Sequence, residues 1–183
     1  MPPLFVYKGK PGGRIEKREF STFENGAFYT VQEKAWMDEK IMLKWVDKVL
    51  KPYVDTIGTG IICPILFLDS YRCHMMASVV NKIQDLGVQV EHIPGGCTGL
   101  LQPIDVGIGK PLKNRVRNCW EDWMVEQSSS TDQFNPPSRK TIASWVVPAL
   151  KELPMQIVQN SWRHKPYDYF EDNEEQGDNE REI

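Results

Sequence analysis

The sequence has little of three features that define whole classes of protein. It holds only four cysteines in 183 residues and no CxxC pair, which excludes a disulfide scaffold and favours a reduced, intracellular compartment. Its apolar runs fall well short of the roughly 18 residues of a membrane span. It begins Met1-Pro2-Pro3, without the charged and then apolar segments of a secretory signal.

The sequence does contain enough apolar material for one folded domain. Hydrophobic residues make up 40% and aromatic residues 10% of the chain, which excludes a wholly disordered protein. A net charge of −3 would argue against a nucleic-acid binder if it were spread evenly along the chain, but it is not. Residues 168–183 hold eight acidic residues against one arginine, which is −7, so the other 167 residues, with 21 basic and 17 acidic groups, carry +4. We expect a mildly basic body and a separate acidic tail.

Hydrophobic periodicity predicts an α/β fold with helices packed on a mixed sheet. The continuous apolar run at residues 61–68 predicts a central strand buried on both faces, which ends at Asp69. Pro52 and Gly87 are predicted to end two helices. The patterns predict strands at residues 3–7, 27–31, 65–68 and 88–93, and helices at residues 38–50, 75–86, 106–127, 139–151 and 155–164.

Two aspartates stand at positions that suit catalysis. Asp69 ends a predicted strand, and Asp105 opens a predicted helix after a glycine-rich loop. Each alone is equally typical of a helix cap or an Asx turn. The helix and strand between them form a crossover that can return the chain to the same edge of the sheet. Two carboxylates there would repel one another unless a divalent ion such as Mg²⁺ neutralised them, which suggests chemistry at a phosphodiester.

These residues lie in segments that resemble a known family. Residues 65–74 read ILFLDSYRCH, and residues 93–107 read IPGGCTGLLQPIDVG. They resemble the second and third acidic blocks of the DDE superfamily endonuclease domain, found in pogo/Tigger-type transposases and in the jerky-like and centromere-protein-B-like proteins. Residues 3–10, Trp36-Met37 and residues 110–113 fit the same pattern.

The resemblance implies an RNase H-like fold in which three carboxylates hold two Mg²⁺ or Mn²⁺ ions for DNA cleavage and strand transfer. Asp69 and Asp105 would be the second and third carboxylates, with Ser70, His74 and Gln102 around them. The family usually has Asn where this chain has Ser70. The resemblance also implies that DNA is the partner and that the protein is nuclear and derived from a transposable element.

The first carboxylate of the family would lie on a strand before Pro3, and no acidic residue precedes Glu16. We therefore expect an N-terminally truncated domain that lacks the first strand and is inactive alone, unless a second copy or an upstream segment supplies that strand. An alternative is a non-enzymatic, host-recruited DNA-binding or protein-interaction module on the same fold. A third is an α/β domain outside this family.

Basic residues follow Asp105 on the predicted long helix. Lys110, Lys113 and Arg117 fall opposite its apolar stripe and could hold DNA phosphates, although a solvated helix face explains them equally well. The tryptophans follow helical periodicity and are expected in the core. A Cys73–His74 nucleophile is disfavoured because adjacent helical residues do not face each other. A zinc site of Cys73, His92 and Cys97 lacks paired ligand spacing.

The same patterns divide the chain into four parts. Residues 1–127 are expected to form the partial DDE endonuclease-like domain. Residues 128–138, rich in serine and proline, are expected to be a linker. Residues 139–170 would form a helical extension and residues 171–183 a disordered acidic tail.

Overall fold

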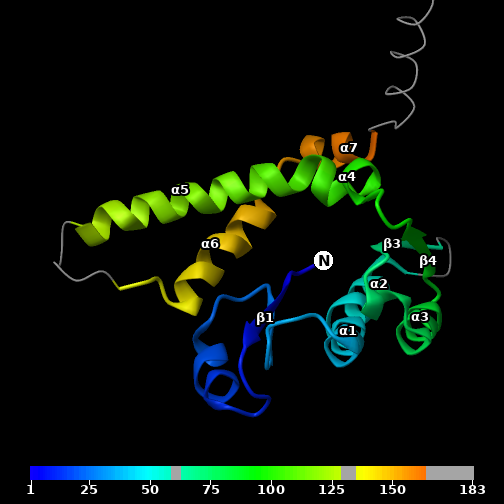
Figure 1. The fold of residues 1–183 in the computed structure, drawn as a ribbon, viewed down its shortest axis with the longest axis horizontal. Coiled ribbons are helices and arrows are strands. Elements are labelled where there is room, and N and C mark those ends of the chain that lie inside the picture. The colour runs from blue at the N-terminus through cyan, green and yellow to red at the C-terminus, as the bar shows by residue number, and fades with distance from the viewer. Residues whose placement is uncertain (59–62, 129–134, 164–183) are drawn as a thin grey trace, which may run out of the picture.

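A computed structural model describes residues 1–58, 63–128 and 135–163. It is a helix-rich α/β structure (Figure 1). None of its helices in these ranges is long and apolar enough to cross a membrane. The strands are β1 (Leu4–Lys8), β2 (Phe28–Gln32), β3 (Ile65–Asp69) and β4 (Gln89–Ile93). The helices are α1 (Glu39–Trp45), α2 (Lys51–Ile57), α3 (Ala77–Gln84), α4 (Thr98–Leu101), α5 (Gly109–Ser128), α6 (Arg139–Lys151) and α7 (Met155–Arg163). Shorter turns are η1 (Ile15–Glu19), η2 (Phe20–Thr22), η3 (Val46–Leu50), η4 (Arg72–Met75) and η5 (Ile104–Ile108).

The α/β class is as predicted, but the described strands do not form one mixed sheet. β1 pairs with β2 and β3 pairs with β4, and both pairs are parallel. Parallel neighbours need a crossover of a dozen or more residues, and residues 9–27 and 70–88 supply crossovers of equal length. In the second pair Asp69 lies opposite Ile93.

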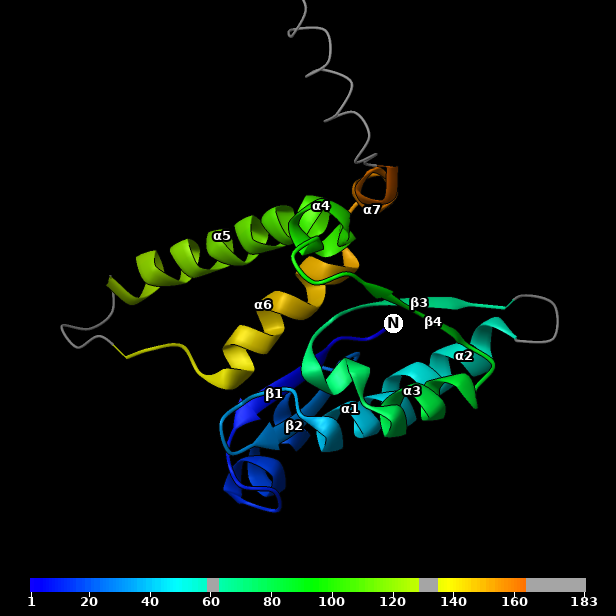
Figure 2. The same cartoon turned by 45° about the vertical axis from the view of Figure 1, so that its right-hand side comes forward.

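The prediction that the strand ending at Asp69 is buried on both faces is wrong. Successive side chains of a strand point to opposite faces, and in the described residues the main core covers one face of β3 more fully than the other. Leu66 and Leu68 pack against the core, whereas Ile65 is 51% and Phe67 44% exposed. Figure 2 shows α1, α2 and α3 together on one side of β3 and β4. On the other side the Phe67 ring meets Trp162 of α7, with 5.3 Å between ring centres.

Pro52 does not end the helix that begins after Asp38. The helix continues through the widened turn η3 into α2 and ends at Ile57. In η3 the Lys51 N–H donates to the Val46 carbonyl, a π-type bond, which places Pro52 in the first turn of α2. A proline is tolerated there because no N–H is required of it. Gly58, with φ of +71°, follows the last turn.

The main core lies between these helices and β3–β4. Val79 and Ile83 of α3 are fully buried and meet Val46 and Leu50 from the turn η3. In each of these pairs the two residues are four apart, so they lie on one face of the helix. The buried members of the cluster are Met42, Val46, Leu50, Val54, Cys73, Val79, Ile83 and Val88.

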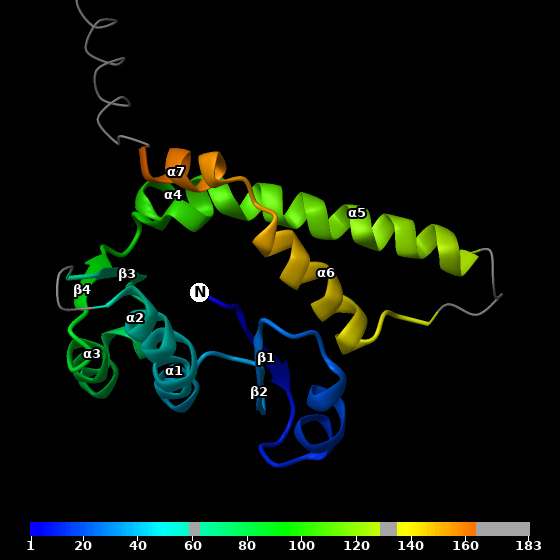
Figure 3. The same ribbon diagram turned by 180° about the vertical axis from the view of Figure 1, so that it is seen from behind.

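Helix α5 and its neighbours form a second layer. α6 runs along α5 and α7 lies beside α4, as seen from behind in Figure 3. α7 also packs on η5, where a Cβ at Gly107 would lie 2.8 Å from the Cβ of Ser161. That separation is too short for any side chain, so a glycine is needed for this close packing.

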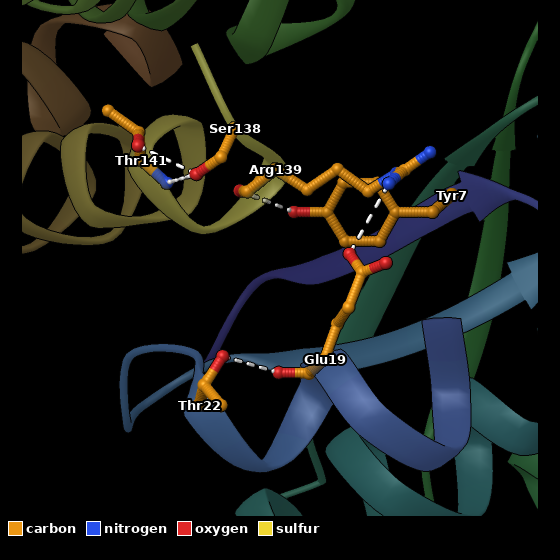
Figure 4. A network of polar contacts seen from close by, with 6 residues as sticks. All are labelled: Tyr7, Glu19, Thr22, Ser138, Arg139 and Thr141. Atoms are coloured by element: carbon orange, nitrogen blue, oxygen red, sulfur yellow. Dashed lines mark hydrogen bonds and ion pairs between the residues drawn. The ribbon is translucent and has the colours of Figure 1, made fainter. Parts of the chain in front are cut away.

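Polar contacts tie α6 to the N-terminal strands (Figure 4). The Tyr7 hydroxyl donates to the Arg139 carbonyl at 3.3 Å, and Arg139 Nη1 lies 3.3 Å from Glu19 Oε2. Burial raises the pKa of Tyr7 to about 12, with the charge on Tyr29 acting in the same direction. The predicted helical extension therefore contacts the N-terminal residues through α6 and the turn η5 through α7.

The four-part division of the chain stays a prediction. Most of the predicted linker and all of the predicted tail lie outside the described residues.

Asp38 is expected to contribute measurably to stability as the N-cap of α1. Its Oδ1 accepts from the Ile41 N–H at 2.9 Å, and its Oδ2 accepts from Gln32 Nε2 at 3.2 Å. Asp38→Ala should lower the free energy of unfolding by about 1 kcal/mol, measured by urea denaturation. Asp38→Asn, which keeps an acceptor at the cap, should cost less than half as much. An equal loss in the two variants would show that the cap bond is not the cause.

Candidate metal and nucleic-acid site

Asp69 stands at the carboxyl end of β3, where it joins two local contacts. Its Oδ1 accepts from the Tyr71 N–H at 3.1 Å, which is an Asx turn. The same oxygen lies 2.6 Å from Nδ1 of His74. The side chains of His74 and Asp69 are 17% and 30% exposed. A turn of this shape explains why a histidine five residues later in the sequence can reach the carboxylate.

Further hydrogen bonds fix the strand ends around this pair. Ser70 Oγ donates to the Ile93 carbonyl at 2.7 Å, which joins the residue just after β3 to the last residue of β4. Nε2 of His92 lies 3.2 Å from the His74 carbonyl. The ring of Tyr71 meets the His74 ring edge to face, with 5.7 Å between centres. Asp69 and His74 are therefore held from several directions, as a preorganised site requires.

Asp105 lies in the first turn of η5, and its side chain is exposed. Its N–H donates to the Gln102 carbonyl at 2.9 Å. Gln102 thus contributes its main chain here, and the described residues give its side chain no hydrogen bond. The interpretation of Asp105 as a helix cap is wrong, because Pro103 holds that position and no side-chain cap bond is made.

Asp69 ends β3 and Asp105 lies in η5, and no contact joins the two aspartates in the described part of the chain. β3 and β4 are parallel, so both end at the same edge of the sheet. From that edge the chain rises to α4 and α5 (Figure 1). Within the described ranges, no hydrogen bond or ion pair links Asp69 to Asp105. Nor do three or more His, Cys, Asp or Glu side chains gather there as potential metal ligands.

The donors present suit one hard divalent cation better than a pair of ions. Mg²⁺ and Mn²⁺ prefer oxygen ligands, and Mg²⁺ often takes only one or two carboxylates and fills the rest with water and phosphate oxygens. Only Oδ1 of Asp69 is engaged by neighbours in the described structure, and the Asp105 carboxylate is exposed. A histidine bonded to a ligating carboxylate is a common outer partner that orients the ligand.

Cys73 is a structural residue rather than a nucleophile. It is 4% exposed and belongs to the main core. Burial raises the pKa of its thiol, and the charges of Asp69 and Asp38 act in the same direction. The thiol therefore stays protonated near neutral pH, which disfavours a Cys73–His74 nucleophile pair.

The basic face of α5 has the arrangement that the helical spacing predicts. Lys110, Lys113 and Arg117 are exposed, and the described residues give none of them an ion pair. Arg115 is half-buried, and its Nη1 lies 3.4 Å from Oε2 of Glu152, just beyond α6. Three cations of one face are thus available to an anionic ligand, which is consistent with phosphate binding.

Sequence reasoning missed a hollow of about 320 Å³ between the start of α1 and the turn η4. Trp36, which is 61% exposed, and Tyr71 line it together with Arg72 and Met76. The signal in the sequence was the pair Trp36-Met37, just before the Asp38 cap. A large ring at that position precedes the helix and is not part of its buried face.

Comparison with known proteins decides the family. A model of the family described as "DDE superfamily endonuclease" matches residues 1–162. The chain belongs to the DDE superfamily endonucleases. This agrees with the resemblance carried by the blocks around Asp69 and Asp105, and it covers β1 through α7 as well.

The relatives of this DDE endonuclease chain include pogo transposable elements with a KRAB or a ZNF domain. It is 24% and 25% identical to the "Pogo transposable element with KRAB domain" of Mus musculus and of Homo sapiens, over 168 residues in each case. These alignments cover 89% of the chain and 26% of each relative. It is also 21% identical to the human "Pogo transposable element with ZNF domain" over 130 residues, 71% of the chain and 9% of that protein. The chain thus spans about a quarter of the KRAB-containing relatives. No solved structure gave a significant match.

Proposed function

We propose that this chain is a transposase-derived, RNase H-like DNA-binding domain in which Asp69 and Asp105 hold Mg²⁺ or Mn²⁺ at a DNA phosphate. The observation that carries the proposal is the contact between Asp69 Oδ1 and His74 Nδ1 at the end of β3. Membership of the DDE endonuclease family supports it, as does the name of the relatives, which are pogo transposable elements.

In this proposal the aspartates bind the ion and the basic residues of α5 bind DNA phosphates. Asp69, oriented by His74 and by the strand-end bonds, offers its second oxygen to the ion. Asp105 offers its carboxylate from η5, and Lys110, Lys113 and Arg117 hold phosphates along α5. A bound divalent ion polarises a phosphodiester and neutralises charge that develops on it. DNA as the partner and the pogo-like relatives support a nuclear location.

With two carboxylates rather than three, these 183 residues are expected to bind DNA without cleaving it by themselves. A two-metal clamp needs ligands that bridge and flank both ions, which is more than Asp69 and Asp105 alone offer. A third carboxylate supplied by a second copy or by a further polypeptide segment would complete the clamp. Use as a host-recruited binding module is compatible with this reduced ligand set.

Duplex DNA binding without cleavage is the expected behaviour of the purified protein. Binding to a labelled duplex should weaken linearly with the logarithm of salt concentration, and Lys110→Gln should lower that slope by about 0.9. Supercoiled plasmid with Mn²⁺ should remain uncut. Failure to bind duplex DNA would contradict the proposal. Nicking that is lost in Asp69→Asn would support the metal site but show that the chain is active alone.

A further inference from the structure

The hollow between the start of α1 and the turn η4 has no role in the proposed function. It encloses about 320 Å³, which is at the lower end of the range of small-ligand pockets. Its lining comes from two segments of the chain. Residues 36–39 lead into α1, and residues 71–73 with Met76 follow β3. Trp36 and Tyr71 are the two aromatic residues of this lining.

Trp36 is presented by a loop whose backbone is fixed by hydrogen bonds. The side-chain oxygen of Gln32 accepts from the N–H groups of Lys34 and Trp36, at 2.6 and 3.1 Å. Ala35 between them has a φ of +59°, a left-handed conformation that is uncommon for residues other than glycine. Strained backbone of this kind is frequent at ligand-binding sites. The loop thus holds in place a residue that is 61% exposed, which lowers the entropy cost of binding to it.

Polar groups of both signs line the same hollow. Arg72 is exposed, and the described residues give it no ion pair. Glu39 accepts from Ser78 Oγ through Oε1 at 2.5 Å, while the described residues give its Oε2 no hydrogen bond. Both oxygens of Asp38 already accept hydrogen bonds. The hollow therefore combines two aromatic rings with a cation and an available carboxylate oxygen.

Tyr71 connects the hollow to the Asp69 site. Its N–H donates to Asp69 Oδ1 at 3.1 Å, and its ring meets the ring of His74. Tyr71 is itself 38% exposed. A ligand in the hollow would therefore contact the turn that carries the Asp69 carboxylate.

We propose that the hollow binds one unpaired DNA base that carries an exocyclic amino group, next to a phosphate bound at the Asp69 site. The base stacks on Trp36, its amino group donates to Glu39, and Arg72 holds an adjacent phosphate. Stacking of this kind needs a base whose face is not covered, as in a single strand. Cytosine, adenine and guanine carry such an amino group, whereas thymine does not. The inference rests on the proposed function and adds a base-selective subsite to it.

Other classes of ligand would use only part of this lining. A lysine or arginine side chain of a partner would suit the rings and Glu39, but it would meet the like charge of Arg72. An acidic peptide would suit Arg72 and be repelled by Asp38 and Glu39. An apolar side chain would bury polar groups without giving them partners. A nucleotide supplies a flat face, an amino donor and a phosphate together.

The test is fluorescence anisotropy of the whole chain with labelled oligodeoxycytidylate, oligothymidylate and duplex of equal length. The wild type should bind oligodeoxycytidylate about fivefold more tightly than oligothymidylate, because only cytosine offers an amino group. Trp36→Ala should weaken oligodeoxycytidylate binding about tenfold, as expected for the loss of one stacked base, and duplex binding less than twofold. Trp36→Phe keeps a flat ring and should recover most of the affinity.

Trp162→Ala is the matched control for the loss of an indole. Trp162 is 55% exposed, contrary to the expectation that the tryptophans of the helices are core residues, and it does not line the hollow. Its replacement should leave binding of all three ligands within twofold of wild type. Circular dichroism of each variant checks folding.

The polar groups have their own tests. Glu39→Ala should reduce the preference for cytosine over thymine to less than about twofold. Glu33→Ala, at an exposed carboxylate nearby in the sequence that does not line the hollow, should keep the preference. Arg72→Gln should reduce the slope of log affinity against log salt by about 0.7 on the single strand. Lys51→Gln should not, because Lys51 is already paired with Asp55.

The outcomes separate the hollow from the proposed function. Trp36→Ala and Glu39→Ala both matching wild type on oligodeoxycytidylate, with duplex binding intact, would overturn the hollow alone. Equal affinity of the wild type for the two single strands would overturn the contact with the amino group. Trp36-dependent binding of oligolysine without binding of oligodeoxycytidylate would overturn the inference in favour of a basic protein partner. Absence of duplex binding in the wild type would instead contradict the proposed function.

Discussion

Asp69→Asn is expected to weaken Mn²⁺ binding by at least about 100-fold, because Asp69 is proposed as a direct ligand and the loss of an outer partner alone already costs roughly 10–100-fold. The substitution keeps the shape of the side chain and an oxygen for the Tyr71 N–H and His74 Nδ1 contacts. What it removes is the negative charge that a divalent ion requires. Free Mn²⁺ measured by electron paramagnetic resonance gives the affinity directly, without DNA or cleavage.

The matched control for this experiment is Asp55→Asn. It also removes one negative charge, but from an exposed pair with Lys51 on α2. Its Mn²⁺ affinity should stay within twofold of wild type. Equal weakening in Asp55→Asn and Asp69→Asn would show that the ion responds only to net charge and would contradict a site at β3.

A double-mutant cycle tests whether Asp105 binds the same ion as Asp69. No contact between Asp69 and Asp105 is seen in the described residues, so a shared ion is the link that the proposal requires. If both bind one ion, the double variant should lose much less than the sum of the two single losses, because the first substitution already removes the site. Additive losses would place the two aspartates at independent sites.

The sequence predicts what depends on local physics. The helix that the apolar spacing predicts at residues 75–86 is present as α3, and the helix predicted from residue 38 begins after the N-cap Asp38. The contact of Asp69 with His74 depends on one turn after β3, so spacing together with family resemblance could suggest it. In these cases the partners lie within a few residues of one another.

The failed predictions concern long-range packing or rare local geometry. The number of covered faces on β3 depends on what packs against Phe67. Its partner is Trp162, which is distant in the sequence. Pro52 was misjudged because a widened turn is invisible in a 3.6-residue pattern.

Ile83→Ala is expected to have the largest effect on stability. Ile83 is completely buried in α3, within the cluster that also supports Leu66 and Leu68 of β3. Removing its outer carbons leaves a cavity and should lower the free energy of unfolding by about 3 kcal/mol. That is a large part of the free energy of unfolding of a typical domain, which is roughly 5–15 kcal/mol. Urea denaturation followed by tryptophan fluorescence measures the loss.

Two variants show whether burial is the cause. Ile57→Ala truncates the same side chain at a position that is 39% exposed and should cost less than about 1 kcal/mol. Ile83→Val removes only one methyl group and should cost about 1 kcal/mol. Because Leu68 precedes Asp69 and rests on this cluster, Ile83→Ala should also weaken Mn²⁺ binding at temperatures where the protein is still folded, and Ile57→Ala should not. Unchanged Mn²⁺ binding in folded Ile83→Ala would show that the turn after β3 holds Asp69 without help from the core.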